Sequence, residues 1–318
     1  MIEGELGPAR QQVGPIVPAA DQATTTHRAW LLLGGVILVW GLHWTVTKIG
    51  LESIPPMTYA MLRVLVGAIV LALLMRRRRR LALPDRRDLP VILSYGLLAI
   101  AAATALMTIA LLSAPAGRSS ILTYTLPLWV VPIMAWVTAS LPTRRELVGL
   151  ALGLGGLVLL LNPLAMDWSS PDALVAAVML LTGAVLSAIA LVHVRVHHWH
   201  GTPFDVQLWQ LLVALAPLTI LAFVLEQPTS VSWDLRTMAA LMYSGVLATA
   251  FAYWASQAAT LGVGPVVASV TYLGVPVVGV LGGALILGEA VPLTDVLGMV
   301  VIGAGISLVA LAHRATTG

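Results

Sequence analysis

The sequence predicts an all-α membrane protein with ten transmembrane helices, arranged as two inverted five-helix repeats. Three observations lead to this fold class. The chain of 318 residues is 59% hydrophobic, with a mean hydropathy of +0.94 and only 10% charged residues, whereas soluble domains carry about 25% charged residues. Its apolar residues come in runs long enough to cross a bilayer. The chain also matches itself in two long registers.

The apolar runs are each close to the roughly 20 residues that cross about 30 Å of hydrocarbon as a helix. A membrane β-barrel would show short alternating segments instead. Residues 1–28, before the first run, are rich in Pro, Gln, Ala and Thr and are expected to form a disordered cytoplasmic tail. The ten runs lie near residues 29–49, 57–75, 90–112, 118–139, 145–162, 172–193, 204–225, 236–260, 265–287 and 292–312.

The two registers define an internal repeat. Residues 40–74 align with residues 187–221 at an offset of 147, and residues 118–161 align with residues 267–310 at an offset of 149. A repeat with an odd number of spans per copy must cross the membrane in opposite directions, and inverted repeats are typical of secondary transporters. We therefore expect a first repeat over residues 29–163 and a second, inverted repeat over residues 171–313.

The arginines predict the orientation, because positive charge near span ends faces the cytoplasm. The connection between the second and third runs carries Arg76 to Arg80, followed by Arg86 and Arg87. With this connection inside, 13 of the 17 lysines and arginines are cytoplasmic, and both termini lie inside. The run Arg76 to Arg80 has two interpretations: a topology determinant, or a binding site for anionic lipid.

Several function classes find no support in the sequence. The chain has no cysteine, which excludes disulfides and thiolate chemistry. The pI near 9.6 comes from arginines that flank the spans, so we expect no nucleic-acid partner. Motifs of intramembrane or metal-dependent hydrolases are absent from the sequence, so we expect no enzyme activity, no catalytic residue, no cofactor and no metal site.

Arg63 is the clearest polar residue at membrane depth. It lies about 10 Å into the second run, at 1.5 Å per residue, where polar side chains are functional candidates. Two interpretations stay open. The guanidinium either reaches to the interface or to broken backbone, or it lines a cavity and attracts a substrate carboxylate. Its repeat mate, Gln210, is neutral, so an anion site would be one-sided.

Aromatic residues give the second signal of a substrate site. Trp40 and Trp44 are four residues apart and share a helix face. Buried Trp and Tyr usually find a partner for their polar atom, and core packing remains the alternative for any single one. Together they predict an aromatic, weakly polar cavity for small amphipathic molecules. The cavity candidates are Trp40, His43, Trp44, Tyr59, Arg63, Tyr124, Trp129, Gln210, Tyr253, Trp254, Gln257 and Tyr272.

Two prolines occupy equivalent positions in the repeats. Pro127 and Pro276 each lie inside an apolar run, where proline removes a hydrogen bond and kinks the helix. We expect them to act as hinges or kinks. No Asp or Glu lies in the middle of a run. Because proton-driven carriers often use a buried carboxylate, this weakens proton coupling, with His43 as the remaining titratable candidate inside a run.

The chain resembles the EamA-type modules of the drug/metabolite transporter (DMT) superfamily. The resemblance rests on Trp40-Gly41, Lys48, Pro55-Pro56 and Arg63 in the first copy, and on residues 262–289 followed by Gly298 in the second. Residues 114–140 resemble the same later part of the module. The first copy departs from the pattern, because Ser140 stands where the second copy has Glu289.

This resemblance implies a carrier with a central cavity between two repeats, drawn from spans 1, 3, 4, 6, 8 and 9. The superfamily includes amino-acid exporters of the YddG type. We therefore expect a multi-pass protein of the bacterial inner membrane that exports small organic metabolites, amino acids or related compounds, by alternating access, with one repeat rocking against the other. An uncoupled facilitator or a channel is the main alternative, and the expected state is a monomer or a homodimer.

Overall fold

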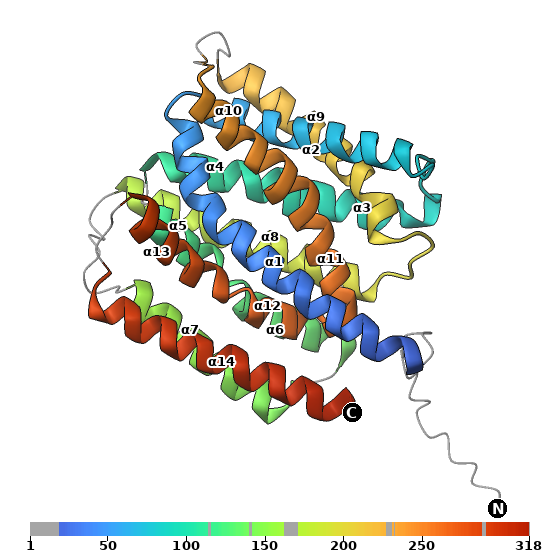
Figure 1. Cartoon of the computed structure of the whole chain (residues 1–318), viewed down its shortest axis with the longest axis vertical. Coiled ribbons are helices and arrows are strands. Elements are labelled where there is room, and N and C mark those ends of the chain that lie inside the picture. Colours follow the sequence, from blue (N-terminus) through green and yellow to red (C-terminus); the bar gives the residue numbers. More distant parts are fainter. Residues whose placement is uncertain are drawn as a thin grey trace, which may run out of the picture.

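The computed structural model describes residues 19–113, 116–139, 142–161, 171–226, 231, 233–287 and 291–317. Figure 1 shows a bundle of long helices that run roughly side by side. The first repeat comprises α1 (Ala19–Leu51), α2 (Pro56–Arg77), η1 (Arg86–Asp88), α3 (Leu89–Ser94), η2 (Tyr95–Ala102), α4 (Ala103–Ser113), α5 (Ala116–Thr123), α6 (Leu126–Thr138) and α7 (Arg144–Leu161). The second comprises α8 (Pro171–Val196), α9 (Pro203–Leu225), α10 (Leu235–Met242), η4 (Tyr243–Phe251), α11 (Ala252–Val263), α12 (Pro265–Thr271), α13 (Gly274–Leu287) and α14 (Leu293–Thr317).

Nine helical segments in the described part of the chain are long and apolar enough to cross a membrane. The remaining predicted span is α7, which has 18 residues and begins with Arg144, Arg145 and Glu146. Those three charges lie at its first turn, as expected for a helix that starts at the membrane surface. Among the described residues no strand is present. The predicted fold class, an all-α membrane protein with two repeats, is confirmed.

The expected tail over residues 1–28 is too long. Helix α1 begins at Ala19, so residues 19–28 are helical, while residues 1–18 lie outside the described part. The local sequence explains the difference, because Ala19, Ala20, Gln22 and Ala23 are strong helix formers and Pro18 precedes them. The apolar run near residue 29 marks where the helix reaches hydrocarbon depth and not where it starts.

Two helix starts are capped by a threonine together with an acidic residue three positions later. Thr143 and Glu146 form a reciprocal capping box at α7, with the Thr143 amide donating to Glu146 at 2.7 Å and the Glu146 amide donating to Thr143 at 3.3 Å. Thr202 and Asp205 form the same box at α9, where Pro203 is the first helical residue. These boxes satisfy amide groups that helix starts leave without a partner.

The pair α7 and α14 shows how the repeats are related. These two helices form the lower edge of the bundle in Figure 1. A Cβ on Gly156 would lie 2.6 Å from the carbonyl oxygen of Gly298, and one on Gly305 would lie 2.6 Å from that of Gly149. Gly149 corresponds to Gly298, and Gly156 to Gly305, so the contacts are reciprocal. Gly149 meets Gly305 and Gly156 meets Gly298, so the two equivalent helices run antiparallel, as inverted repeats require.

Helices of the two repeats alternate within the bundle. Helix α2 packs on α9 and η4, while α9 packs on η2, and α1 packs on α11 and α13. The close approaches are again reciprocal. A Cβ on Gly96 would lie 2.7 Å from the backbone oxygen of Gln210, and one on Gly245 would lie 3.1 Å from that of Arg63. The repeats are therefore interleaved, and neither forms a separate body that could rock against the other.

Both repeats interrupt the α-helix at equivalent places. The π-helical segments η2 and η4 lie at the same position in the third and eighth spans. The fourth span breaks at residues 124–125, between α5 and α6, and the ninth breaks at residues 272–273, between α12 and α13. Pro127 and Pro276 follow these breaks by two and three residues, as expected from their missing amide hydrogens. The helices therefore break in the regions that the matched prolines indicated.

Three chain segments meet at one end of the bundle. The start of α1, the end of α14 and the arginine-rich connection from α2 to α3 all lie toward the right of Figure 1. Two of the arginines in this connection contact α9: Arg78 lies over the Phe204 ring at 5.5 Å, and Arg80 pairs with Asp205 at 3.7 Å. The start of α1, the end of α14 and the arginine-rich connection thus share one side of the molecule.

We predict that Gly156→Ala destabilises the protein by about 1–3 kcal/mol, because the added methyl group overpacks the α7–α14 contact. Gly155→Ala is the matched control on the same helix, since a Cβ there meets nothing within 4 Å, and alanine favours the helix over glycine. Thermal unfolding in detergent measures both. Equal melting temperatures for the two variants would contradict the reciprocal contact.

Candidate functional site

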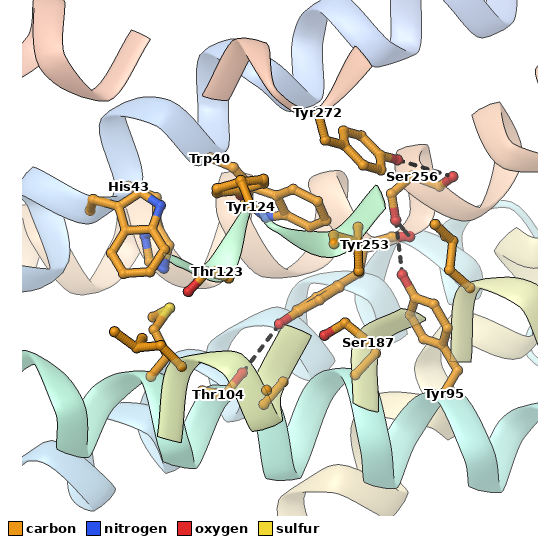
Figure 2. Close-up of a pocket in the computed structure, with 18 of the residues that line it drawn as sticks. Trp40, His43, Tyr95, Thr104, Thr123, Tyr124, Ser187, Tyr253, Ser256 and Tyr272 are labelled. Carbon is orange, nitrogen blue, oxygen red and sulfur yellow. Dashed lines mark hydrogen bonds between the residues drawn. The ribbon is translucent and has the colours of Figure 1, made fainter. Parts of the chain in front are cut away.

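A cavity lies at the centre of the bundle, between helices of both repeats (Figure 2). Its wall draws on spans 1, 3, 4, 6, 8 and 9, the set implied by the resemblance, and also on span 2 through Arg63. The space between its lining atoms, including the opening, is about 880 Å³. Seven predicted candidates line it: Trp40, His43, Trp44, Arg63, Tyr124, Tyr253 and Tyr272.

Arg63 is a buried cation in the cavity wall. Only 2% of the residue is exposed. Its Nη1 atom donates to Nε2 of His43, and its Nη2 atom donates to the Tyr253 hydroxyl at 3.3 Å. Its Nε atom has no partner, and no carboxylate pairs with Arg63 among the described residues. Neither snorkelling nor broken backbone accounts for its position, and its Nε–H group is left without an acceptor among the described residues.

His43 binds the Nη1 group of this arginine. A guanidinium has only donors, so Nε2 of His43 accepts the bond and the ring hydrogen sits on Nδ1. Nδ1 faces Ser244 at 3.3 Å, and Ser244 in turn lies 2.5 Å from the Tyr59 hydroxyl. Tyr59 is therefore behind the wall and supports His43 from α2, instead of lining the cavity as predicted.

An aromatic cluster forms one end of the cavity. Trp40 lies 5.6 Å from Tyr253 and 5.7 Å from Tyr272, measured between ring centroids. The hydroxyl of Tyr95 bonds to Oγ of Ser256 at 2.8 Å, and the Tyr272 hydroxyl donates to the Ser256 carbonyl at 3.5 Å. Figure 2 shows these side chains gathered together, with the hydroxyl bonds drawn. The rings fill this end, and their polar atoms are satisfied internally.

Near the middle of the cavity, two equivalent residues touch. Thr104 and Tyr253 correspond at the offset of 149, and their hydroxyls lie 3.2 Å apart. Contact between equivalent residues places the pseudo-two-fold axis between them. The cavity therefore straddles the axis, as expected for a carrier whose substrate site lies between inverted repeats.

The glutamine candidates form a network of their own. Nε2 of Gln257 donates to Gln207 at 2.6 Å and to Gln210 at 2.8 Å, and all three side chains are buried. This network joins α9 to α11 outside the cavity lining. The repeat mate of Arg63 thus has a structural role, and the positive charge of the cavity is one-sided. Gln207 was not singled out by the sequence.

Two predicted tryptophans also lie away from the cavity lining. Trp254 packs against Phe204 and Phe251, with centroids 6.2 and 6.1 Å away. Trp129 packs on the core cluster, and its indole nitrogen is buried without a partner in the described part of the chain. Sequence reasoning in turn missed small hydroxyl residues that do line the cavity. These are Thr104, Thr123, Ser187 and Ser256, together with Tyr95.

A buried carboxylate ties the repeats together at the arginine-rich end. Asp88, at the start of the third span, is fully buried. It accepts bonds from the His197 ring at 2.9 Å, the His200 amide at 3.1 Å and the Gly201 amide at 2.7 Å. The connection from α8 to α9 is therefore fastened to α3. Glu226 makes the opposite fastening, accepting from the Met57 and Thr58 amides at 2.6 and 2.8 Å.

A bundle of interleaved inverted repeats around an axial cavity defines a membrane transporter. Its family is shown by comparison: a profile of the EamA-like transporter family matches residues 28–162 and 174–311. The chain belongs to the EamA-like transporter family. The two matched segments cover both repeats, and the protein is a transporter of the DMT type.

Relatives extend over most of the chain. The "Uncharacterized transporter YoaV" of Bacillus subtilis is 26% identical over 271 residues, which cover 85% of this chain and 92% of that protein. The "Probable amino-acid metabolite efflux pump" of Salmonella typhimurium is 26% identical over 286 residues, covering 85% and 91%. One crystal structure, 18% identical, superposes with a TM-score of 0.73 over 89% of this chain and 98% of that one. That likeness shows the fold.

Asp88→Ala is expected to lower the free energy of unfolding by about 3 kcal/mol, because two buried amides and an imidazole lose their acceptor. Asp85→Ala is the matched control three residues away, since Asp85 is exposed and accepts only the Arg87 amide. We expect a loss of about 1 kcal/mol there. Melting temperatures in detergent compare the two variants. Similar losses of stability for both would show that Asp88 does not stabilise the contact between the repeats.

Proposed function

We propose that this transporter exports amino acids or related small carboxylates by alternating access through the axial cavity. The observation that carries the proposal is Arg63, a buried cation in the cavity wall without an acidic partner in the described residues. An unpaired buried charge is costly, so such an arginine is best explained by an anionic group that arrives with the substrate.

The geometry of the guanidinium favours a carboxylate. Nη1 is held by His43, which leaves the edge formed by Nε and Nη2. Two parallel N–H groups on one edge match the two oxygens of a carboxylate. The weak bond from Nη2 to Tyr253 at 3.3 Å is the one that a substrate would displace. The phenol ring of Tyr253 then lies beside the bound group.

The rest of the wall fits an amphipathic solute. Trp40, Trp44, Tyr124 and Tyr272 provide aromatic faces, while Thr104 and Ser187 provide hydroxyls. This mixture suits an amino acid, which has a charged head and a variable side chain. The name of the Salmonella relative, a probable amino-acid metabolite efflux pump, supports the same substrate class. We assign export on this name and on the resemblance to exporters.

For the orientation, we propose that both termini and the arginine-rich connection face the cytoplasm, by the rule that positive charge stays inside. A relative named "Uncharacterized inner membrane transporter YedA" in Escherichia coli is 33% identical over 131 residues, which supports the bacterial inner membrane as the location. Because the repeats are interleaved, the moving groups in alternating access must each combine helices of both repeats.

Arg63→Gln is the direct test, since it gives the first repeat the residue of the second. In proteoliposomes carrying a panel of amino acids, we expect this variant to reduce flux of the free acids about 10-fold or more, the loss of a charge-assisted hydrogen-bond pair. Flux of the corresponding amino-acid amides should be unaffected by the substitution, because they lack the carboxylate.

The matched control is Arg236→Gln, which removes an exposed arginine paired with Glu52 at 3.3 Å. It should leave flux of acids and amides unchanged. Equal loss of acid and amide flux in Arg63→Gln, or a matching loss of folded yield, would make Arg63 a structural residue. Absence of flux for every amino acid in the wild-type protein would refute the proposed substrate class.

A further inference from the structure

The two ends of the cavity are built from equivalent positions but from different side chains. The offset of 149 extends back to Gly96 and Gly245, since both glycines make the reciprocal helix approaches. At this offset Tyr95 corresponds to Ser244, Tyr253 to Thr104 and Tyr272 to Thr123. At the offset of 147, Trp40 corresponds to Ser187. Every aromatic residue of the cluster therefore has a serine or threonine as its mate.

The aromatic end lies toward the arginine-rich side of the molecule. Tyr95 follows the start of α3 by six residues, and Tyr272 follows the start of α12 by seven. Thr123 lies at the end of α5, a helix that enters the bundle from the opposite side. Figure 2 shows Tyr95, Ser256 and Tyr272 at one end of the cavity and Thr123 with His43 at the other.

Burial shows which end is closed. Tyr95 is 3% exposed, and Ser256 and Tyr272 are each 1% exposed. At the other end Met107 and Thr123 are partly exposed, whereas His43 beside them is buried; Trp40 is the one partly exposed member of the aromatic cluster. Because inverted repeats make the two ends equivalent in backbone, the difference comes from side-chain volume. Rings fill one end, whereas hydroxyl residues of the same register leave the other end open.

We infer that Trp40, Tyr95, Tyr253, Tyr272 and Ser256 form a gate that closes the cavity toward the arginine-rich side, and that the hydrogen bond from Tyr95 to Ser256 is its latch. This bond joins η2 in the third span to α11 in the eighth span, and its length of 2.8 Å is that of a well-formed hydroxyl bond. The bond of Tyr272 stays within the second repeat. The gate rests on the proposed alternating access and adds which side is closed and what holds it.

The gate predicts a built-in preference between the two access states. Opening toward the arginine-rich side must separate four packed rings and the latch. Opening toward the other side separates no such cluster, because the equivalent positions hold Ser187, Thr104 and Thr123. The resting state is therefore open away from the arginine-rich side. Loss of the latch shifts the equilibrium toward the state that is open to the arginine-rich side, without altering the shape of the rings.

The chain has no native cysteine, so a single reporter thiol can measure the two states. Ser187→Cys places the thiol in the cavity wall, where it is reached from one side in each state. A membrane-impermeant methanethiosulfonate reagent is applied to intact cells and, separately, to inside-out membrane vesicles. We divide the labelling rate from the side opposite the arginine-rich connection by the rate from the arginine-rich side. This ratio reports the populations of the two access states and needs no substrate. We expect faster labelling from the side opposite the arginine-rich connection.

Tyr95→Phe and Ser256→Ala each remove the latch while keeping the protein packed, and each should lower this ratio about fivefold, the factor that one hydrogen bond of about 1 kcal/mol produces. Tyr272→Phe is the matched control, because it removes a buried hydroxyl of the same gate whose bond to the Ser256 carbonyl is long, at 3.5 Å, and therefore weak. It should leave the ratio unchanged. Using two latch variants separates loss of the bond from any local packing fault in one of them.

Faster labelling of the parent from the arginine-rich side would overturn the gate. So would an unchanged ratio in both latch variants, or an equal shift in Tyr272→Phe. The outcome is separable from the proposed function. The expected ratios without amino-acid flux leave the gate standing and refute the substrate class, whereas amino-acid flux with an unshifted ratio refutes only the gate.

Discussion

The inversion of the two repeats is the constraint on which the rest of this structure depends. A module with an odd number of spans cannot be copied in tandem without turning its second copy over in the membrane. Equivalent residues then face opposite sides of the bilayer, and their helices meet around a two-fold axis. The reciprocal approaches of Gly149 to Gly305 and of Gly156 to Gly298 follow from this relation, as does the contact of Thr104 with Tyr253.

Because the scaffold is symmetric, function must come from its mismatches. A fully symmetric cavity would have the same charge and the same width at both ends. Here Arg63 faces the cavity while Gln210 is tied into an amide network, so the positive charge is one-sided. The aromatic cluster closes one end, while serine and threonine occupy its mates. In the proposed transport, the charge of Arg63 selects the substrate. The volume of the side chains at each end of the cavity determines from which side of the membrane the substrate enters.

Hydrogen bonding inside the bundle divides into two kinds. Carboxylates at the two ends, the buried Asp88 and the partly buried Glu226, fasten connections of one repeat to helices of the other through backbone amides. The cavity instead uses side-chain bonds between hydroxyls, an imidazole and a guanidinium, which exchange partners without breaking a helix. In a low-dielectric interior the first kind is expensive to lose, so it suits the frame. The second kind suits the part that must rearrange.

The sequence by itself determined the fold class, the repeat and its inversion, because hydrophobic length and arginine placement are properties of the chain. It also identified Arg63, since an arginine inside an apolar run can be recognised from the sequence without a structure. The tertiary structure decided which aromatic residues face the cavity. Tyr59, Trp129 and Trp254 are of the same residue types as Trp40 and Tyr253 and lie at similar depths in their spans. Only the rotation and packing of the helices determine which of these side chains line the cavity and which lie in the core.

Thr104, Thr123 and Ser187 gave no signal in the sequence, because a hydroxyl residue in a membrane helix usually bonds its own backbone. Their place in the cavity wall became evident only in the folded structure.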